Sequence, residues 1–137
     1  MFGIFGTMVI RKAQMDAMKP LAETGFHSRV VDYVKQNCAV AGLTEDALGQ
    51  RITFAINRAR GQKLITEQGI TAFVALMFNL SPNFDDELQI QLILRNTKVP
   101  EPDRIRQLVL NVSAQTWRTV ATARRDEIWH FKALSVS

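Results

Sequence analysis

The amino-acid sequence predicts an all-α protein, a compact bundle of five or six helices in a single domain. Apolar residues recur every three or four positions along five segments, no useful stretch alternates with the period of a β-strand, and prolines or capping residues stand at the joints. The 137 residues are 47% hydrophobic and 22% charged, which is typical of one folded domain. We expect an apolar N-terminal extension at residues 1–7, the bundle at 8–125, and a short aromatic tail or half-helix at 126–137.

The first two helical stripes cover residues 14–37 and 43–60. Pro20 and Gly25 interrupt the first stripe, so it is either a short lead-in helix followed by a main one or a single kinked helix. The second stripe is uninterrupted. Thr44 is the expected N-cap of its helix, and the acids Glu45 and Asp46 follow in the first turn, where the helix dipole favours them.

The third helix, over residues 66–80, is expected to be central in the bundle. Gly61 is predicted to end the preceding helix, and Thr66 begins this one. Its apolar residues extend beyond one stripe, so it is expected to be covered on more than one side. Ser81-Pro82 ends it, because a residue before proline is pushed out of the helical region. The main stripe contains Ile70, Phe73, Val74, Met77 and Leu80.

A fourth helix is expected after a tight joint at residues 83–85. Asp85 is predicted to cap it and Phe84 to pack back onto it as a hydrophobic staple. The helix then runs through Leu88 and Leu92 to about residue 97.

The fifth helix is predicted to run from Pro102, a residue suited to a first turn, to about residue 125. The last dozen residues contain Trp129 and Phe131. They form either a half-helix folded back on the core or an exposed docking tail.

Few residues suggest chemistry. Cys38 cannot form an intramolecular disulfide as the single cysteine, and it is expected to be a structural, partly buried thiol. His27 lies eleven residues before it and is not expected to meet it. The acids at 85–87 are typical of a helix start rather than a metal site. No phosphate-binding or dinucleotide-binding glycine motif occurs, so the sequence predicts no enzyme activity, no cofactor and no metal.

The charge and the N-terminus narrow the possible partners. The apolar run at residues 1–10 is shorter than the roughly 20 residues that a bilayer span needs, so no membrane association is expected.

The sequence pI is about 9.6, and arginines recur along two of the predicted helices. A nucleic-acid interface would need several of them on one exposed face, and a solvated arginine-rich surface is the favoured alternative.

The net charge of +4 is divided unevenly along the chain. Residues 64–103 hold two basic and six acidic residues, whereas residues 1–63 hold nine and five, and residues 104–137 hold six and two. An acidic middle therefore lies between two basic flanks. This pattern favours a protein partner over nucleic acid, and part of it is expected to be neutralised within the fold.

Short pieces at the predicted joints resemble, in order, a family of small uncharacterised helical proteins encoded beside spike, PAAR-repeat and effector genes of bacterial type VI secretion systems. The pieces are residues 9–15 (Val-Ile-Arg-Lys-Ala-Gln-Met), 57–60 (Asn-Arg-Ala-Arg), 65–67 (Ile-Thr-Glu), 73–77, and 80–85 (Leu-Ser-Pro-Asn-Phe-Asp). The chain departs from the pattern at Ser81, where the family has glycine, and in lacking a tryptophan soon after the Phe-Asp pair. The resemblance implies structural roles for Arg11, Gln14, Met15, Arg58, Arg60, Thr66, Glu67, Phe73, Met77, Pro82, Phe84 and Asp85.

The resemblance implies a non-enzymatic adaptor or chaperone-like protein that binds a secreted effector, a toxin domain or the spike. An immunity protein that neutralises a cognate toxin is the alternative, and a nucleic-acid-binding module is a third and less favoured one. A bacterial cytoplasmic location is expected, or export together with an effector. The candidate partner-binding residues are aromatic and apolar residues without an obvious core role, unless they pack on the bundle itself: Phe2, Ile4, Phe5, Trp129 and Phe131.

Overall fold

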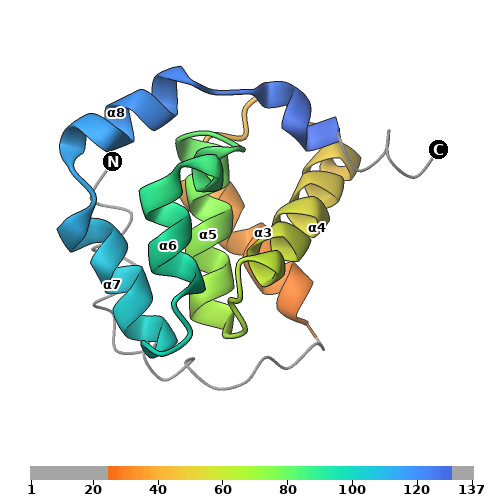
Figure 1. The fold of residues 1–137 in the computed structure, drawn as a ribbon. Helices are drawn as coiled ribbons and strands as arrows, with labels where there is room; N and C mark the ends of the chain where they lie inside the picture. The colour runs from red at the N-terminus through yellow and green to blue at the C-terminus, as the bar shows by residue number, and fades with distance from the viewer. Residues whose placement is uncertain (1–24, 131–137) are drawn as a thin grey trace.

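Six α-helices and two short 3-10 helices make up residues 25–130, the part of the chain that the computed structural model describes (Figure 1). No strand occurs within this part, so the predicted all-α bundle is confirmed. None of its helices has both the length and the apolar character needed to cross a membrane. The helices are α3 (Phe26–Asn37), α4 (Glu45–Gly61), α5 (Glu67–Asn79), η1 (Phe84–Asp86), α6 (Leu88–Arg95), α7 (Glu101–Asn111), α8 (Ala114–Thr122) and η2 (Asp126–His130).

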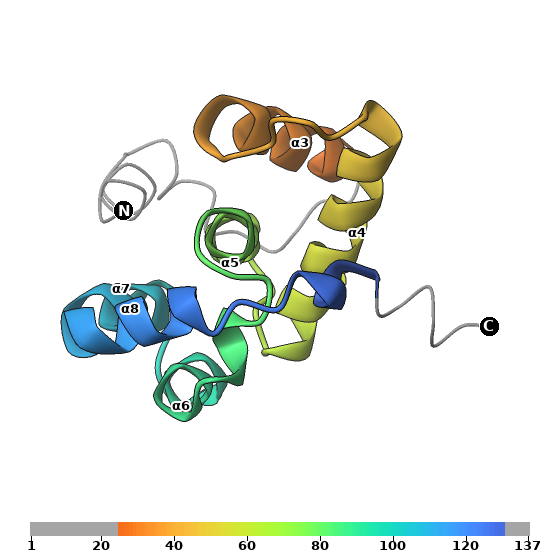
Figure 2. The same cartoon turned by 90° about the horizontal axis from the view of Figure 1, so that it is seen from above.

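Helix α5 occupies the centre, as its composition predicts. Every residue from Gln68 to Phe78 is buried, and Figure 2 shows α5 nearly end-on with α3, α4, α6 and α7 arranged around it. Helices α3, α4 and α7 contact it directly. Because the whole circumference of α5 is covered, its side chains form the middle of one continuous core.

The start of α3 follows from one glycine. Gly25 has a φ of 79°, in the left-handed region that glycine adopts without a side-chain clash, and α3 begins at the next residue. The sequence allows either a short lead-in helix or a kinked helix before this point, and residues 14–24 lie outside the described residues.

Helix α4 ends at Gly61, as predicted. The residue with the left-handed conformation is Lys63 and not the glycine, with a φ of 69°. Lys63 N donates to Arg60 O at 3.0 Å, and Leu64 N donates to Ala59 O at 3.3 Å. These bonds form a Schellman-type end in which lysine stands where glycine is usual, and Leu64 is fully buried behind it.

The fourth helix begins two residues later than predicted, and Asp85 does not cap it. The N-cap of α6 is Glu87, whose side chain accepts a hydrogen bond from Ile90 N at 3.0 Å. Asp85 instead lies buried in η1. Phe84 packs against Phe73 of α5, with ring centroids 4.8 Å apart.

The apolar face of α6 also differs from the prediction. Ile90 and Leu94 face the core, whereas Leu88 and Leu92, the two leucines named for this helix from the sequence, are exposed. The short helix has apolar residues on two faces, and only one of them packs on the protein.

The predicted fifth helix is two helices. It breaks at Val112–Ser113, where Ser113 caps α8 by accepting from Thr116 N at 3.1 Å. The serine hydroxyl offers the backbone a helix start within a continuous apolar pattern, which favours a break over a single long helix. After α8 the chain crosses to η2 beside α4 (Figure 1).

The packing at the start of α5 predicts that Gly69 tolerates no side chain. A Cβ at Gly69 would lie 2.0 Å from Glu101 Oε2, so Gly69→Ala should lower the free energy of unfolding by about 1–3 kcal/mol in urea denaturation. The matched control is Gly49→Ala in α4, where a Cβ meets nothing within 4 Å. That change should stabilise the protein by about 0.5–1 kcal/mol, and equal effects of the two substitutions would contradict the close approach.

Candidate functional site

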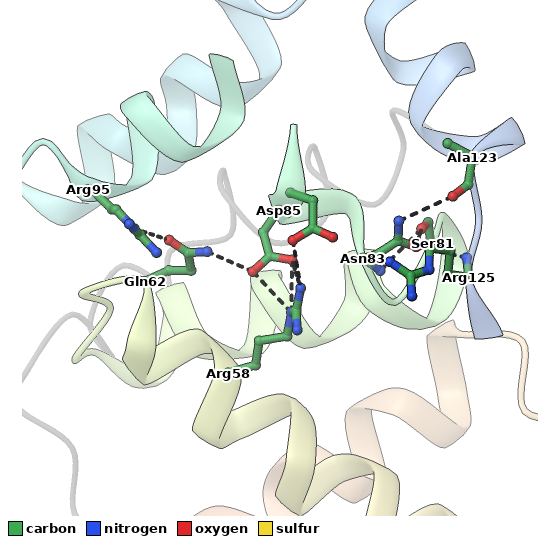
Figure 3. Close-up of polar contacts among 9 residues, drawn as sticks. Arg58, Gln62, Ser81, Asn83, Asp85, Arg95, Ala123 and Arg125 are labelled. Atoms are coloured by element: carbon green, nitrogen blue, oxygen red, sulfur yellow. Dashed lines mark hydrogen bonds and ion pairs between the residues drawn. The ribbon is translucent and has the colours of Figure 1, made fainter. Parts of the chain in front are cut away.

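A buried ion pair joins α4 to the joint before α6 (Figure 3). Arg58 Nε lies 2.9 Å from Asp85 Oδ1 and 3.1 Å from Oδ2, and Arg58 Nη2 lies 2.8 Å from Oδ1. The same Nη2 lies 3.2 Å from Asp86 Oδ1. The Asp85 side chain is only 2% exposed, so its charge is balanced inside the protein by this guanidinium.

Gln62 extends this cluster to α6. It is the C-cap of α4, four residues after Arg58, and its Nε2 donates to Asp85 Oδ2 at 2.7 Å. Its Oε1 accepts from Arg95 Nε at 2.7 Å (Figure 3). An open hollow of about 280 Å³ lies over these side chains, lined also by Asp86 and Gln91. Three elements, α4, η1 and α6, therefore meet around one polar cluster.

A second set of polar contacts fixes the chain after α8 (Figure 3). Asn83 Oδ1 accepts from Ser81 Oγ at 2.6 Å and from Arg125 N at 2.9 Å. Asn83 Nδ2 donates to Ala123 O at 3.2 Å. The joint between α5 and α6 thereby holds a segment that follows 40 residues later.

A third polar cluster lies at the start of α5. The Glu101 carboxylate accepts from Ile65 N at 2.9 Å, from Thr66 N at 3.0 Å and from the Thr66 hydroxyl. Arg104 Nη2 lies 3.8 Å from Glu101 Oε1. Arg104 also donates to three carbonyls, those of Leu94 at 2.6 Å, Val99 at 3.0 Å and Lys63 at 3.2 Å.

These clusters hold helices together. Each oxygen of the buried carboxylates Asp85 and Glu101 accepts at least one hydrogen bond, so their lone pairs are directed at the protein itself. Within residues 25–130, no group of three or more His, Cys, Asp or Glu side chains is placed to hold a metal ion. The geometry favours an architectural role for the clusters.

The two other residues considered for chemistry lie apart. His27, at the start of α3, shares a 3.0 Å hydrogen bond with Thr53 on α4. Cys38, just past the end of α3, is partly buried, and loss of hydration raises the pKa of its thiol to about 11. A thiol with this pKa is almost entirely protonated near neutral pH, so it is a poor nucleophile there.

The residues implied by the resemblance occupy joints and core positions where the structure describes them. Arg58 meets Asp85, Phe73 meets Phe84, and Met77 is fully buried. Thr66 caps α5 by accepting from Gly69 N. The remaining ones are Glu67, which pairs with Arg29 at 2.8 Å, Pro82, which is buried, and Arg60, which is exposed.

Several residues named from the sequence lie outside the described residues. They are Arg11, Gln14 and Met15 of the first family piece and four candidate partner-binding residues, Phe2, Ile4, Phe5 and Phe131.

Trp129 is a core residue, and this removes it from the candidate partner-binding residues. It is 5% exposed, with its ring centroid 4.8 Å from that of Phe78 and 6.2 Å from that of Phe54. The Arg51 guanidinium carbon lies 5.2 Å from the centroid. Residues 126–130 thus follow the alternative in which the tail folds back on the bundle, because an indole buries a large apolar area against these rings.

The large apolar side chains that remain exposed lie elsewhere. Leu88 is 66% exposed and Leu92 is 64% exposed, both on α6. Leu110 on α7, the helix that packs on α6, is 70% exposed, and Ile65 before α5 is 66% exposed. An open hollow of about 480 Å³ lies beside Leu92. The sequence did not indicate this surface, because leucines four residues apart on a helix are equally compatible with a core face and with an exposed face.

Comparisons with protein families, with curated proteins and with solved structures each find no match to this chain. The function therefore has to be argued from the chain's own surface and charges.

The buried ion pair predicts a large loss of stability when only one partner is removed. Arg58→Met leaves the buried Asp85 carboxylate without its guanidinium, and should lower the free energy of unfolding by about 3–5 kcal/mol. The control is Arg106→Met, which breaks a pair with Asp103 whose side chains are both about half exposed, and should cost less than about 1 kcal/mol. Urea denaturation measures both values. Losses of equal, small size would show that Gln62 alone is enough to hold Asp85.

Proposed function

We propose that this chain is a non-enzymatic, protein-binding accessory of a type VI secretion effector or spike, an adaptor or chaperone-like protein. The observation that carries the proposal is the outer face of α6, where Leu88 and Leu92 are both about two-thirds exposed on one short helix. Two leucines at i and i+4 lie side by side on a helix surface. Such a pair, beside a hollow and within a polar surround, is typical of a protein-binding surface.

The contrast between the two faces of α6 supports this proposal. Its inner face is held by Ile90 and Leu94 in the core, and the bond from Arg95 to Gln62 fixes its C-terminal end. The helix therefore has a fixed position before any partner binds, and a preorganised surface loses little conformational freedom on binding. An apolar pair on a fixed helix serves binding better than the same pair on a mobile loop.

The resemblance supports the choice of partner. The family pieces are those quoted at the joints, and they contain structural residues such as Arg58 and Asp85. In the family, such small helical proteins are encoded beside effector and spike genes. We therefore take the partner to be a secreted effector, its toxin domain or the spike.

Coexpression with the products of the adjacent effector and spike genes tests the proposal. The full chain should copurify with one of them, and Leu88→Ser with Leu92→Ser should reduce the captured partner at least tenfold, because both apolar contacts are lost. The matched control is Ile65→Ser, which removes an apolar side chain with the same 66% exposure as Leu88 and should leave capture unchanged.

Two results would contradict the proposal. In one, no neighbouring product is captured by the unsubstituted chain. In the other, the double substitution and Ile65→Ser have equal effects, which would place the binding surface elsewhere. Rescue of cells from a neighbouring toxin would instead support the immunity role.

A further inference from the structure

The exposed face of α6 has an ordered pattern of charge and apolar groups. Leu88, Gln91, Leu92 and Arg95 follow one another at helical spacing, so they share the outer face. Asp86 lies just before the helix, with 53% of its side chain exposed. We call these five residues the α6 strip. From its N-terminal to its C-terminal end the strip is acidic, apolar, apolar and basic.

This pattern is complementary to itself. If two copies of the strip lie antiparallel, Asp86 of each copy faces Arg95 of the other, and Leu88 faces Leu92. The midpoint between Asp86 and Arg95 and the midpoint between Leu88 and Leu92 fall within one residue of each other in the sequence. One two-fold axis, near Gln91, therefore satisfies the charged pairs and the apolar pairs together, as a two-fold interface requires.

We propose that the α6 strip pairs with the α6 strip of a second copy of this chain about such an axis. The inference rests on the proposed protein-binding role of this surface, and it assigns the surface to a second copy while no effector or spike component is bound there. The argument for a second copy is the symmetric order of charges. An unrelated partner would need complementary charges too, but it would not require the acid and the base to be placed symmetrically about the leucines.

The charged ends of the strip retain hydrogen-bonding capacity. Arg95 uses Nε to bind Gln62, and within residues 25–130 no hydrogen bond from its two terminal nitrogens is found. Asp86 accepts from Arg58 through Oδ1, and within the same range no donor reaches Oδ2. An exposed guanidinium with two terminal nitrogens available and a half-exposed carboxylate can form a short ion pair across the axis.

The surface also has room for the facing leucine. The hollow of about 480 Å³ beside α6 is lined by Gln91, Leu92, Arg95 and Asn96. In the antiparallel arrangement Leu88 of the second copy faces Leu92, at the edge of this hollow. In Figure 2 helix α6 lies at the edge of the described part of the chain, on the opposite side of α5 from α3, and no described helix covers its outer face.

Light scattering after size-exclusion chromatography of the full chain tests the pairing. The interface is small, so we expect a weak dimer, visible at protein concentrations on the order of 100 μM. Asp86→Lys alone places two bases opposite each other, and Arg95→Glu alone places two acids opposite each other. Each single variant should be monomeric at this concentration. Arg106→Glu, a charge reversal on α7 outside the strip, is the control and should leave the dimer intact.

Mixing the two single variants gives the decisive result. In a mixed dimer the introduced lysine faces the introduced glutamate, and Arg95 of one chain faces Asp86 of the other, so the mixture should recover the dimer mass. The double variant D86K/R95E should also recover it. Recovery in the mixture cannot come from a repaired fold, because each chain keeps its own substitution. A thermal melt of each variant verifies that it is folded.

Three results would overturn the inference. They are an unsubstituted chain that stays monomeric, single variants that remain dimeric, and a mixture that stays monomeric when both chains are folded. A monomeric chain that still captures an effector or spike product through Leu88 and Leu92 would overturn the pairing and leave the proposed function standing. A dimer that passes the mixing test and captures no such product would support the pairing and count against the proposed function.

Discussion

The complete burial of α5 constrains the rest of the structure. A helix leaves its first N–H groups without helical partners, and inside a core these groups must be satisfied by the protein. Thr66 accepts one of them, and the Glu101 carboxylate accepts the N–H groups of Ile65 and Thr66 just before the helix. Placing a carboxylate there requires a buried cation, which Arg104 supplies. Since Arg104 also binds carbonyls at the ends of α4 and α6, the start of α5 fixes where three other helices begin or end.

The segregation of charge along the sequence has a structural explanation. Of the six acids in residues 64–103, five pair with arginines of the basic flanks: Glu67 with Arg29, Asp85 and Asp86 with Arg58, Glu101 with Arg104, and Asp103 with Arg106. The sixth, Glu87, caps α6. Glu67, Asp85 and Asp86 pair with arginines of the preceding basic flank, whereas Glu101 and Asp103 pair with arginines three residues later in the same helix, α7. The pattern in the sequence therefore reflects both contacts between helices and pairs within α7. The chain has a basic pI, but several of its arginines are paired with acids of the same chain. This pairing weakens the case for a nucleic-acid surface.

Local signals allowed much of the fold to be predicted, and the errors came from non-local contacts. The caps at Thr44 and Thr66 and the central position of α5 follow from the residues nearby. Glu101 was unremarkable in the sequence because its partners lie 35 residues away, although an acid directly after Pro100 was a signal for a helix start. Asp85 carried a valid capping pattern, but Arg58 offered it a stronger partner through tertiary contact. Ser113 was a local signal for the break between α7 and α8, and the continuous apolar pattern concealed it.

Helix α6 shows that the identity of an exposed surface, like the fold, depends on contacts between residues far apart in the sequence. Periodicity over eight residues fits two stripes, one through Leu88 and Leu92 and one through Ile90 and Leu94, and the sequence alone does not choose between them. The choice is made by tertiary contacts, because Arg104 binds the Leu94 carbonyl and Gln62 binds Arg95, and both contacts orient the helix. An isolated helix of this length is unstable in water, so α6 owes its shape to the bundle. The bundle thus holds a preformed apolar pair at its surface, at the place where the proposed contact with another protein would form.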